Sequence, residues 1–228
     1  RRAGRVHSRA DRSHRDVSKM LDLLLAAVAL AIALSLRPWR VVGSAGPPWP
    51  WMALWACLPL VWGVDRYVGL AVVQPLSGAV LLMLLAGWPL TVLSLIPVAL
   101  VTGVLAGLEW VQVLQRFVWL GLVPATLALA WGGLLRRWLP HHLFIYILGR
   151  GFIGTALCTA AAGWLSGWLH GSPPGVDDSE LAIARWLAAW GDAFLAGMLV
   201  AIFVAFRPQW LATYSDRLYL DDDRPPEP

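Results

Sequence analysis

Two charged residues stand inside long apolar stretches of this sequence, where a charge is costly. Arg150 lies in the run LPHHLFIYILGRGFIG at 139–154, and Asp192 lies in a later apolar run. An ionised side chain at the centre of a membrane-spanning helix costs roughly 2.5–3.5 kcal/mol on insertion scales. Neither residue is therefore expected to face lipid, and both are candidates for a buried substrate-binding or coupling site.

Each charge also has a structural interpretation. Arg150 lies roughly 10 Å into its run, so its side chain can snorkel to the headgroups. Asp192 lies roughly 21 Å from the C-terminal end of its own run, and a neighbouring helix can cap it. The sequence leaves both interpretations open, as well as whether the two charges pair. For the functional interpretation, we expect Asp192→Asn to abolish cargo binding while the protein still inserts.

The adjacent His141 and His142 precede the same run as Arg150 and are further candidates for a substrate-binding or coupling site. Neighbouring residues on a helix point about 100° apart, so the pair cannot hold one metal ion without outside ligands. The alternative is an interfacial pair that hydrogen-bonds at a helix start. The sequence has no P-loop, HExxH, GxSxG or CxxCH motif. We therefore expect no enzyme activity, no metal and no cofactor.

The composition indicates a membrane protein. Hydrophobic residues make up 58% of the 228 residues and charged residues only 14%, and the mean hydropathy is +0.63. A soluble domain carries about 25% charged residues, so lipid must replace water around much of the chain. Many of the 15 tryptophans stand where apolar runs end, which is typical of the headgroup boundary.

Seven apolar runs predict the elements that position these side chains. A spanning helix needs about 17–25 residues, and all the runs except the second approach or reach that length. They are continuous and rich in Ala and Leu, which favours helices over strands. We expect an all-α polytopic membrane protein, a bundle of about seven transmembrane helices within 20–206, followed by a polar tail over 207–228. The predicted spans are 20–36, 51–64, 70–87, 90–108, 117–135, 143–169 and 183–206.

The arginines outside these spans predict the orientation. Arg66 and Arg116 fall on one side of a seven-span bundle, together with an acidic loop over 177–180. The positive-inside rule places the other, arginine-rich side in the cytoplasm, so the N-terminus is expected outside and the C-terminus inside. The arginines on that side are Arg37, Arg40, Arg136, Arg137, Arg207 and Arg217.

The first 19 residues conflict with that orientation. They contain seven Lys or Arg and two Asp, a net charge of +5, which leaves −1 for the rest of the chain. The pI of 9.6 is thus a property of this tail, and we expect no nucleic-acid partner. The composition predicts disorder, and the tail is a basic arm, a targeting segment or sequence upstream of a native start at Met20. The third interpretation is favoured because it removes the conflict.

Glycines cluster in the predicted sixth span. Small residues let helices approach closely in membranes, so this span is expected at the centre of the bundle. The alternative, ordinary membrane composition, accounts poorly for so dense a cluster. The candidate helix-packing residues are Gly149, Gly151, Gly154, Gly163 and Gly167.

Two stretches carry a resemblance to a known family. RRWLPHHLFIYILGRGFIGTAL at 136–157 and GDAFLAGMLVAIFVAFRPQWLATYSDRLYL at 191–220 resemble uncharacterised proteobacterial membrane proteins of the energy-coupling factor transporter permease type, distant relatives of cobalt- and nickel-binding permease subunits. LRPWR at 36–40 and AGWPL at 86–90 are similar as well. The resemblance covers about 20–220, and it is stronger after residue 136.

The resemblance implies a substrate-binding subunit in the bacterial inner membrane, with about seven helices and an outward N-terminus. Its partners would be the lipid bilayer, a second membrane subunit and separate cytoplasmic ATPases. The chain departs from the metal-binding relatives: Met20, Leu21 and Asp22 include no His, and Gln74 and Pro75 stand where relatives carry a His. Asp192 stands where relatives often have a Glu, and Arg150 replaces a neutral polar residue.

Three functions are weighed on these grounds. The first is a permease-like, substrate-binding subunit of an energy-coupling factor transporter without an ATPase of its own. The second is a non-catalytic structural or assembly subunit of a larger bacterial membrane complex, which has kept the permease fold but lost the metal site. The third, a membrane-embedded enzyme, has the least support.

Overall fold

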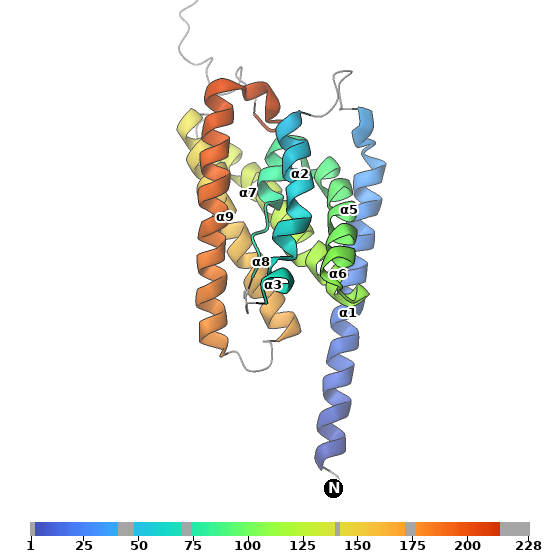
Figure 1. Cartoon of the computed structure of the whole chain (residues 1–228). Coiled ribbons are helices and arrows are strands. Elements are labelled where there is room, and N and C mark those ends of the chain that lie inside the picture. The colour runs from blue at the N-terminus through green and yellow to red at the C-terminus, as the bar shows by residue number, and fades with distance from the viewer. Residues whose placement is uncertain (1–2, 41–47, 70–73, 140–141, 172–176, 215–228) are drawn as a thin grey trace, which may run out of the picture.

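The computed structural model describes residues 3–40, 48–69, 74–139, 142–171 and 177–214, and within these ranges every regular element is a helix (Figure 1). Two segments are π-helices, η2 and η3, and each runs directly into the α-helix that follows. The α-helices are α1 (Ala3–Ser35), α2 (Trp49–Trp62), α3 (Val64–Tyr67), α4 (Ala79–Ala86), α5 (Trp88–Ala106), α6 (Trp110–Arg116), α7 (Val123–Trp138), α8 (Gly154–His170) and α9 (Asp178–Phe206). The π-helices are η2 (Phe117–Leu122) and η3 (Ile145–Ile153), and the 3-10 helices are η1 (Pro38–Arg40) and η4 (Pro208–Trp210).

Five helical segments are long and apolar enough to cross a bilayer, which makes the chain a multi-pass membrane protein. The prediction of an all-α membrane bundle is confirmed, and five of the seven predicted spans coincide with helices of spanning length. The count of seven stays a prediction. The five segments are Asp16–Ser35, Trp88–Ala106, Trp110–Trp138, Ile145–His170 and Asp178–Phe206.

The third predicted span is not the continuous helix expected over 70–87. Residues 70–73 lie outside the described ranges, residues 74–78 are not helical, and only α4 follows. Pro75 lacks an N–H and restrains the residue before it, so it does not suit a helix interior. Gly78 then turns the chain into α4 with φ +62°, a conformation that glycine adopts without strain. The eight residues of α4 cover only about 12 Å.

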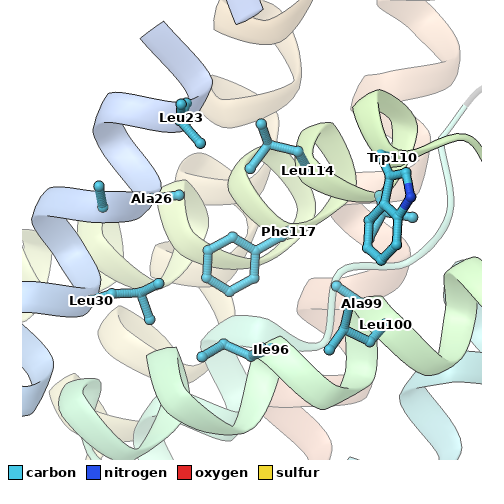
Figure 2. Close-up of a pocket in the computed structure, with 11 residues that line it drawn as sticks. Leu23, Ala26, Leu30, Ile96, Ala99, Leu100, Trp110, Leu114 and Phe117 are labelled. Atoms are coloured by element: carbon cyan, nitrogen blue, oxygen red, sulfur yellow. The ribbon is translucent and has the colours of Figure 1, made fainter. Parts of the chain in front are cut away.

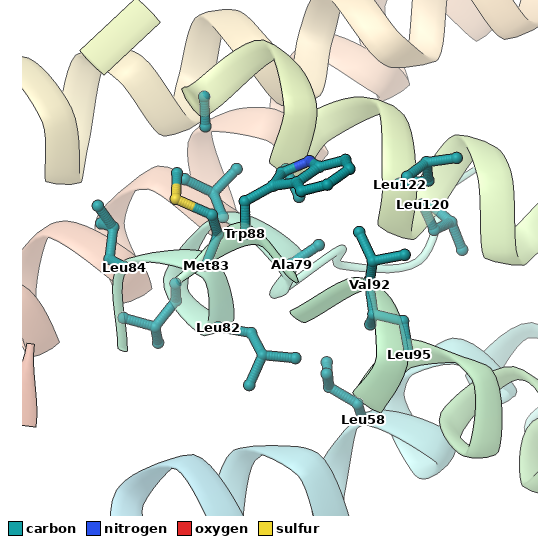
Figure 3. Packing of buried hydrophobic residues seen from close by; sticks show 14 of the residues in the cluster. Leu58, Ala79, Leu82, Met83, Leu84, Trp88, Val92, Leu95, Leu120 and Leu122 are labelled. Carbon is teal, nitrogen blue, oxygen red and sulfur yellow. The ribbon is translucent and has the colours of Figure 1, made fainter. Parts of the chain in front are cut away.

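α4 forms the centre of the hydrophobic core. Seven of its eight residues, from Ala79 to Leu85, are buried, and Figure 3 shows its side chains among those of α2, α5 and η2. A helix that is apolar on every side needs apolar neighbours on every side. Such a short helix, with unsatisfied backbone groups at both ends, depends on the surrounding bundle. The contacts at its two ends are therefore informative.

Residues 3–19 are helical, in the region where the sequence predicted a disordered tail. Helix α1 begins at Ala3 and continues without interruption to Ser35, and its N-terminal part extends past the end of the bundle (Figure 1). Neither Gly nor Pro occurs from residue 5 to residue 37. Extending a helix that is already nucleated costs little, so the apolar span can propagate into the polar residues before it.

The two ends of the bundle differ in the chain segments they expose. The start of α1, the short helices α3 and α6, the C-terminal end of α8 and the start of α9 lie at one end (Figure 1). The C-terminal ends of α1, α7 and α9 lie at the other end. Arg37, Arg136, Arg137 and Arg207 follow or end these helices. These four arginines, which the sequence assigned to one side, therefore do lie together, whereas Arg217 lies outside the described residues.

Candidate functional site: a polar cavity at one end of the bundle

Asp192 is buried in α9 and binds the start of α4. One carboxylate oxygen, Oδ2, accepts the backbone N–H of Ser77 at 2.7 Å, and Oδ1 accepts that of Gly78 at 3.3 Å. These donors lie just before Ala79, where the positive end of the helix dipole favours a negative group. Asp192 thus caps the start of α4 from another helix, beside Ser77 Oγ, which accepts the N–H of Ala79 at 3.2 Å.

Ser77 connects the same stretch to two further elements. Its Oγ donates to the carbonyl of Leu120 at 2.5 Å, and its own carbonyl accepts the indole N–H of Trp62 at 2.9 Å. Leu120 belongs to the π-helix η2, and π-helical turns displace carbonyls from the regular α-helical pattern. The non-helical residues before α4 are therefore held by α2, η2 and α9 together.

Arg150 is buried at the opposite end of α4. Its Nη1 donates to the carbonyl of Thr213 at 3.5 Å, and its guanidinium carbon lies 5.5 Å from the ring centre of Tyr146. Thr213 in turn donates from its N–H and Oγ1 to the carbonyl of Leu84 near the end of α4. A cation at this position suits the negative end of the helix dipole. Arg150 and Asp192, both described, form no ion pair with each other.

The side chain of Arg150 lies across α7 at Gly132. A Cβ at Gly132 would collide with the guanidinium group, so this glycine makes the space that the arginine occupies. The Nε of Arg150 is buried and has no hydrogen-bond partner in the described part of the chain. Arg150 therefore does not snorkel to solvent, which the sequence had left open.

His142 does not join either charge. His141 lies outside the described residues. His142 is exposed, its Nδ1 accepts the backbone N–H of Phe144 at 3.4 Å, and its carbonyl accepts the N–H groups of Ile145 and Tyr146. This is the helix-start arrangement that the sequence offered as the alternative to a metal or proton role.

The five candidate packing glycines all lie where another side chain approaches closely. A Cβ at Gly149, Gly151 or Gly154 would come within 3.2 Å of Leu135, Val200 or Trp131 respectively. Gly163 and Gly167 face polar side chains instead: a Cβ there would meet Gln74 and Arg185. The last two glycines therefore make room for polar groups.

These two polar groups line a cavity of about 300 Å³ at the end of the bundle where α3 and α6 lie. The cavity is enclosed by α3, the residues before α4, α6 with η2, the end of α8 and the start of α9. Its lining side chains are mostly charged or amide groups. They are Asp65, Arg66, Gln74, Pro75, Gln112, Gln115, Arg116, Trp119, Leu120, Gly163, Ser166 and Arg185.

The three arginines of the cavity have different partners. Arg116 donates to both carboxylate oxygens of Asp65, at 3.0 and 2.6 Å, and also to the carbonyl of Trp62. Arg66 is exposed and donates to the amide oxygen of Gln112 at 3.3 Å. Arg185 is half-buried, and no described residue accepts a hydrogen bond from it or pairs with it. One of the three positive charges is thus neutralised locally, and two are not.

A second polar cluster lies behind Trp119. The indole N–H of Trp119 donates to Asp22 Oδ1 at 2.8 Å, and His170 Nε2 lies 3.0 Å from Asp22 Oδ2. His170 Nδ1 lies 3.0 Å from the carbonyl of Ser166. A protonated imidazole satisfies both acceptors at once, so the geometry suits an ion pair with Asp22. The cluster joins α1 to α8 and fixes the Trp119 ring at the cavity wall.

Sequence reasoning treated these residues only in part. Arg66 and Arg116 counted toward orientation, whereas His170 and Arg185 were assigned no role. The position of these residues was the available signal. Asp22, His170 and Arg185 each lie close to a span end that the predicted topology places on the same side of the membrane. Because successive helices run in opposite directions, the end of one helix and the start of the next lie on the same side of the bundle, and their polar groups can meet there.

An apolar groove of about 320 Å³ opens between α1, α5 and the α6–η2 segment (Figure 2). Leu23 and Leu30 of α1 line one wall, and Ile96, Leu100 and Phe117 line the others. No charged side chain lines it. In a membrane protein, such a groove is compatible with lipid chains and carries no catalytic groups.

The fold and the cavity define a multi-pass helical membrane protein with a water-accessible polar site at one end. Comparison with protein-family models, with curated proteins and with solved structures finds no match to this chain. Within the described ranges, no group of three or more His, Cys, Asp or Glu side chains could hold a metal ion.

Proposed function

We propose that the protein is the solute-binding, permease-like subunit of an energy-coupling factor type transporter whose ATPases are separate chains. The polar cavity carries this proposal, because it combines room for a small molecule with unneutralised charge. The interrupted third span beside it supports the same function. Non-helical backbone at membrane depth is tolerated where protein buries it or a cavity adjoins it, and transporters commonly place binding sites at such breaks.

Counted from Met20 onward, the charge distribution supports an outward-facing cavity. Arg136, Arg137 and Arg207 lie at the opposite end of the bundle, and the positive-inside rule places that end in the cytoplasm. The cavity would then open to the outer side of a bacterial inner membrane, where a solute arrives. Release toward the cytoplasm would require a conformational change, which is the step that a partner ATPase would drive.

Purification of the native complex in a mild detergent tests the proposal. Mass spectrometry of the purified complex should find an ATPase and a second membrane subunit in fixed ratio with this chain. Uptake into vesicles should require ATP. A stable native complex without any ATPase, or with uptake indifferent to ATP, would contradict the transporter function.

One observation favours a second candidate, a non-catalytic structural or assembly subunit. The void beside Asp192 measures only about 10 Å³, room for about one water molecule, and Asp192 is occupied in capping α4. The buried charges would then serve folding alone. Fixed-ratio purification with a larger membrane assembly that contains no ATPase would favour this candidate over the first.

A further inference from the structure

We infer that the polar cavity binds a small anion through the guanidinium groups of Arg185 and Arg66. The inference rests on the proposed function, since it names the chemical class of the solute. Of the residues that line the cavity, three are arginines and one, Asp65, is acidic. Asp65 is bonded at both oxygens to Arg116. The remaining two positive charges belong to Arg66 and Arg185.

Arg185 is the principal anchor in this inference. A half-buried guanidinium group has lost part of its hydration, and it ordinarily recovers that loss by pairing with a carboxylate or phosphate. Arg185 has no such acceptor in the described part of the chain, although its side chain reaches the cavity. Its guanidinium group lies over Gly167, where a Cβ would collide with it. The glycine allows Arg185 to lie flat against α8.

The other lining groups suit the same chemistry. Gln74 and Gln115 line the cavity and carry amide groups that can donate hydrogen bonds to oxygen atoms. The Trp119 ring forms a wall, held from behind by Asp22. Planar guanidinium groups bind carboxylate and phosphate with two parallel hydrogen bonds. A phosphate or a small carboxylate therefore fits both the charge and the donor set.

The anionic group has two sources, a dissolved solute or the headgroup of an anionic lipid, and both present the same oxygen atoms. The full chain is reconstituted in nanodiscs of phosphatidylcholine or of phosphatidylglycerol. Inorganic phosphate and succinate are the probes, and their dissociation constants are measured by calorimetry. Saturable binding of either anion in phosphatidylcholine supports a dissolved solute. Loss of that binding in phosphatidylglycerol supports a lipid headgroup as the competing occupant.

Three substitutions make the test specific. Arg185→Gln removes the principal anchor and should weaken anion binding about tenfold or more, the equivalent of one charge-assisted pair. Arg66→Gln changes an exposed residue, so it should fold and should weaken binding to a smaller degree. Arg137→Gln removes the same charge at the opposite, exposed end of the bundle and should leave the dissociation constant within about twofold.

The inference is overturned if two results occur together. Neither anion binds saturably in phosphatidylcholine nanodiscs, and the melting temperature of the protein is no higher in phosphatidylglycerol nanodiscs than in phosphatidylcholine nanodiscs. Equal weakening in Arg137→Gln and Arg185→Gln also overturns it, because binding would then report overall charge. The binding assay needs neither ATP nor a partner protein. If anion binding depends on Arg185 but the native complex contains no ATPase, only the transporter function is refuted. A native ATPase complex that imports a neutral or cationic solute refutes only the anion.

Discussion

The two charges buried at opposite ends of α4 are held very differently. Asp192 and Arg150 are equally inaccessible, with 3% and 4% of their surfaces exposed. Asp192 uses both carboxylate oxygens on backbone N–H groups. Arg150 makes one long hydrogen bond to Thr213 and leaves Nε without a partner among the described residues. The carboxylate caps a helix, whereas the guanidinium group is only loosely satisfied.

This difference shows that burial alone does not reveal what a charge contributes. Removal of one member of a well-made buried arrangement leaves its partners unsatisfied, which is costly. Replacement of a poorly paired buried charge by an apolar side chain of similar volume is often neutral or stabilising. The two charges should therefore respond in different ways to substitution.

The largest expected effect is that of Asp192→Ala. Two backbone N–H groups at the start of α4 would lose their acceptor, at about 1–3 kcal/mol each, so the free energy of unfolding should fall by about 2–6 kcal/mol. Unfolding in mixed detergent–SDS micelles measures this loss. Glu180→Ala, which changes an exposed acid on the same helix, should remain within about 0.5 kcal/mol of the parent. Similar losses in both variants would refute the capping role.

Asp192→Asn separates the capping role from the cargo role that the sequence suggested. The amide keeps one acceptor oxygen, so this variant should be less destabilised than Asp192→Ala. Asp192 does not line the polar cavity, and we therefore expect Asp192→Asn to retain phosphate or succinate binding wherever it stays folded. Loss of anion binding in a folded Asp192→Asn protein would return Asp192 to the binding site.

A neighbouring pair of glycines tests the position of Arg150. A Cβ at Gly132 would collide with the Arg150 guanidinium group, whereas a Cβ at Gly133 meets nothing within 4 Å. Gly132→Ala should lower the free energy of unfolding by about 1–3 kcal/mol, as overpacking does. Gly133→Ala should be neutral or slightly stabilising because alanine favours helix. Equal effects of the two substitutions would mean that Arg150 does not occupy this space.

The smallest expected effect is that of Arg150→Met. Methionine fills a similar space without a charge, and the single long hydrogen bond to Thr213 contributes little. We expect the free energy of unfolding to change by no more than about 1 kcal/mol, with either sign. A loss as large as that for Asp192→Ala would show that Arg150 is as important to α4 as Asp192 is.

Several elements of the fold could be predicted from local sequence. Length and hydropathy located the five long apolar helices, since a bilayer requires about 20 apolar residues in each. The break in the third span was harder to predict, although Pro75 and Gly78 marked it, because hydropathy does not distinguish a helix from an apolar loop. The helix at 3–19 was missed because its polar composition was taken as disorder, while its continuity with the next span was given no weight.

The candidate site was less accessible to sequence reasoning. Asp192 and Arg150 stood out because charges are rare in apolar runs, but their partners are backbone groups with no sequence signature. Arg185 and Gln74 are far apart in the chain, and each looks like an ordinary polar residue near the end of a span. They line one cavity only because both pack against glycines of α8, Gln74 at Gly163 and Arg185 at Gly167.

The sequence by itself determined that lipid surrounds the chain, that helices form it, and that two charges must be shielded. Transfer free energies act residue by residue, so a linear pattern is sufficient for these conclusions. Only the tertiary structure decided that α4 separates the two charges, that Asp192 caps a helix, and that unpaired arginines meet at one end. Those outcomes depend on distances between groups remote in the chain, and packing of the whole bundle sets those distances.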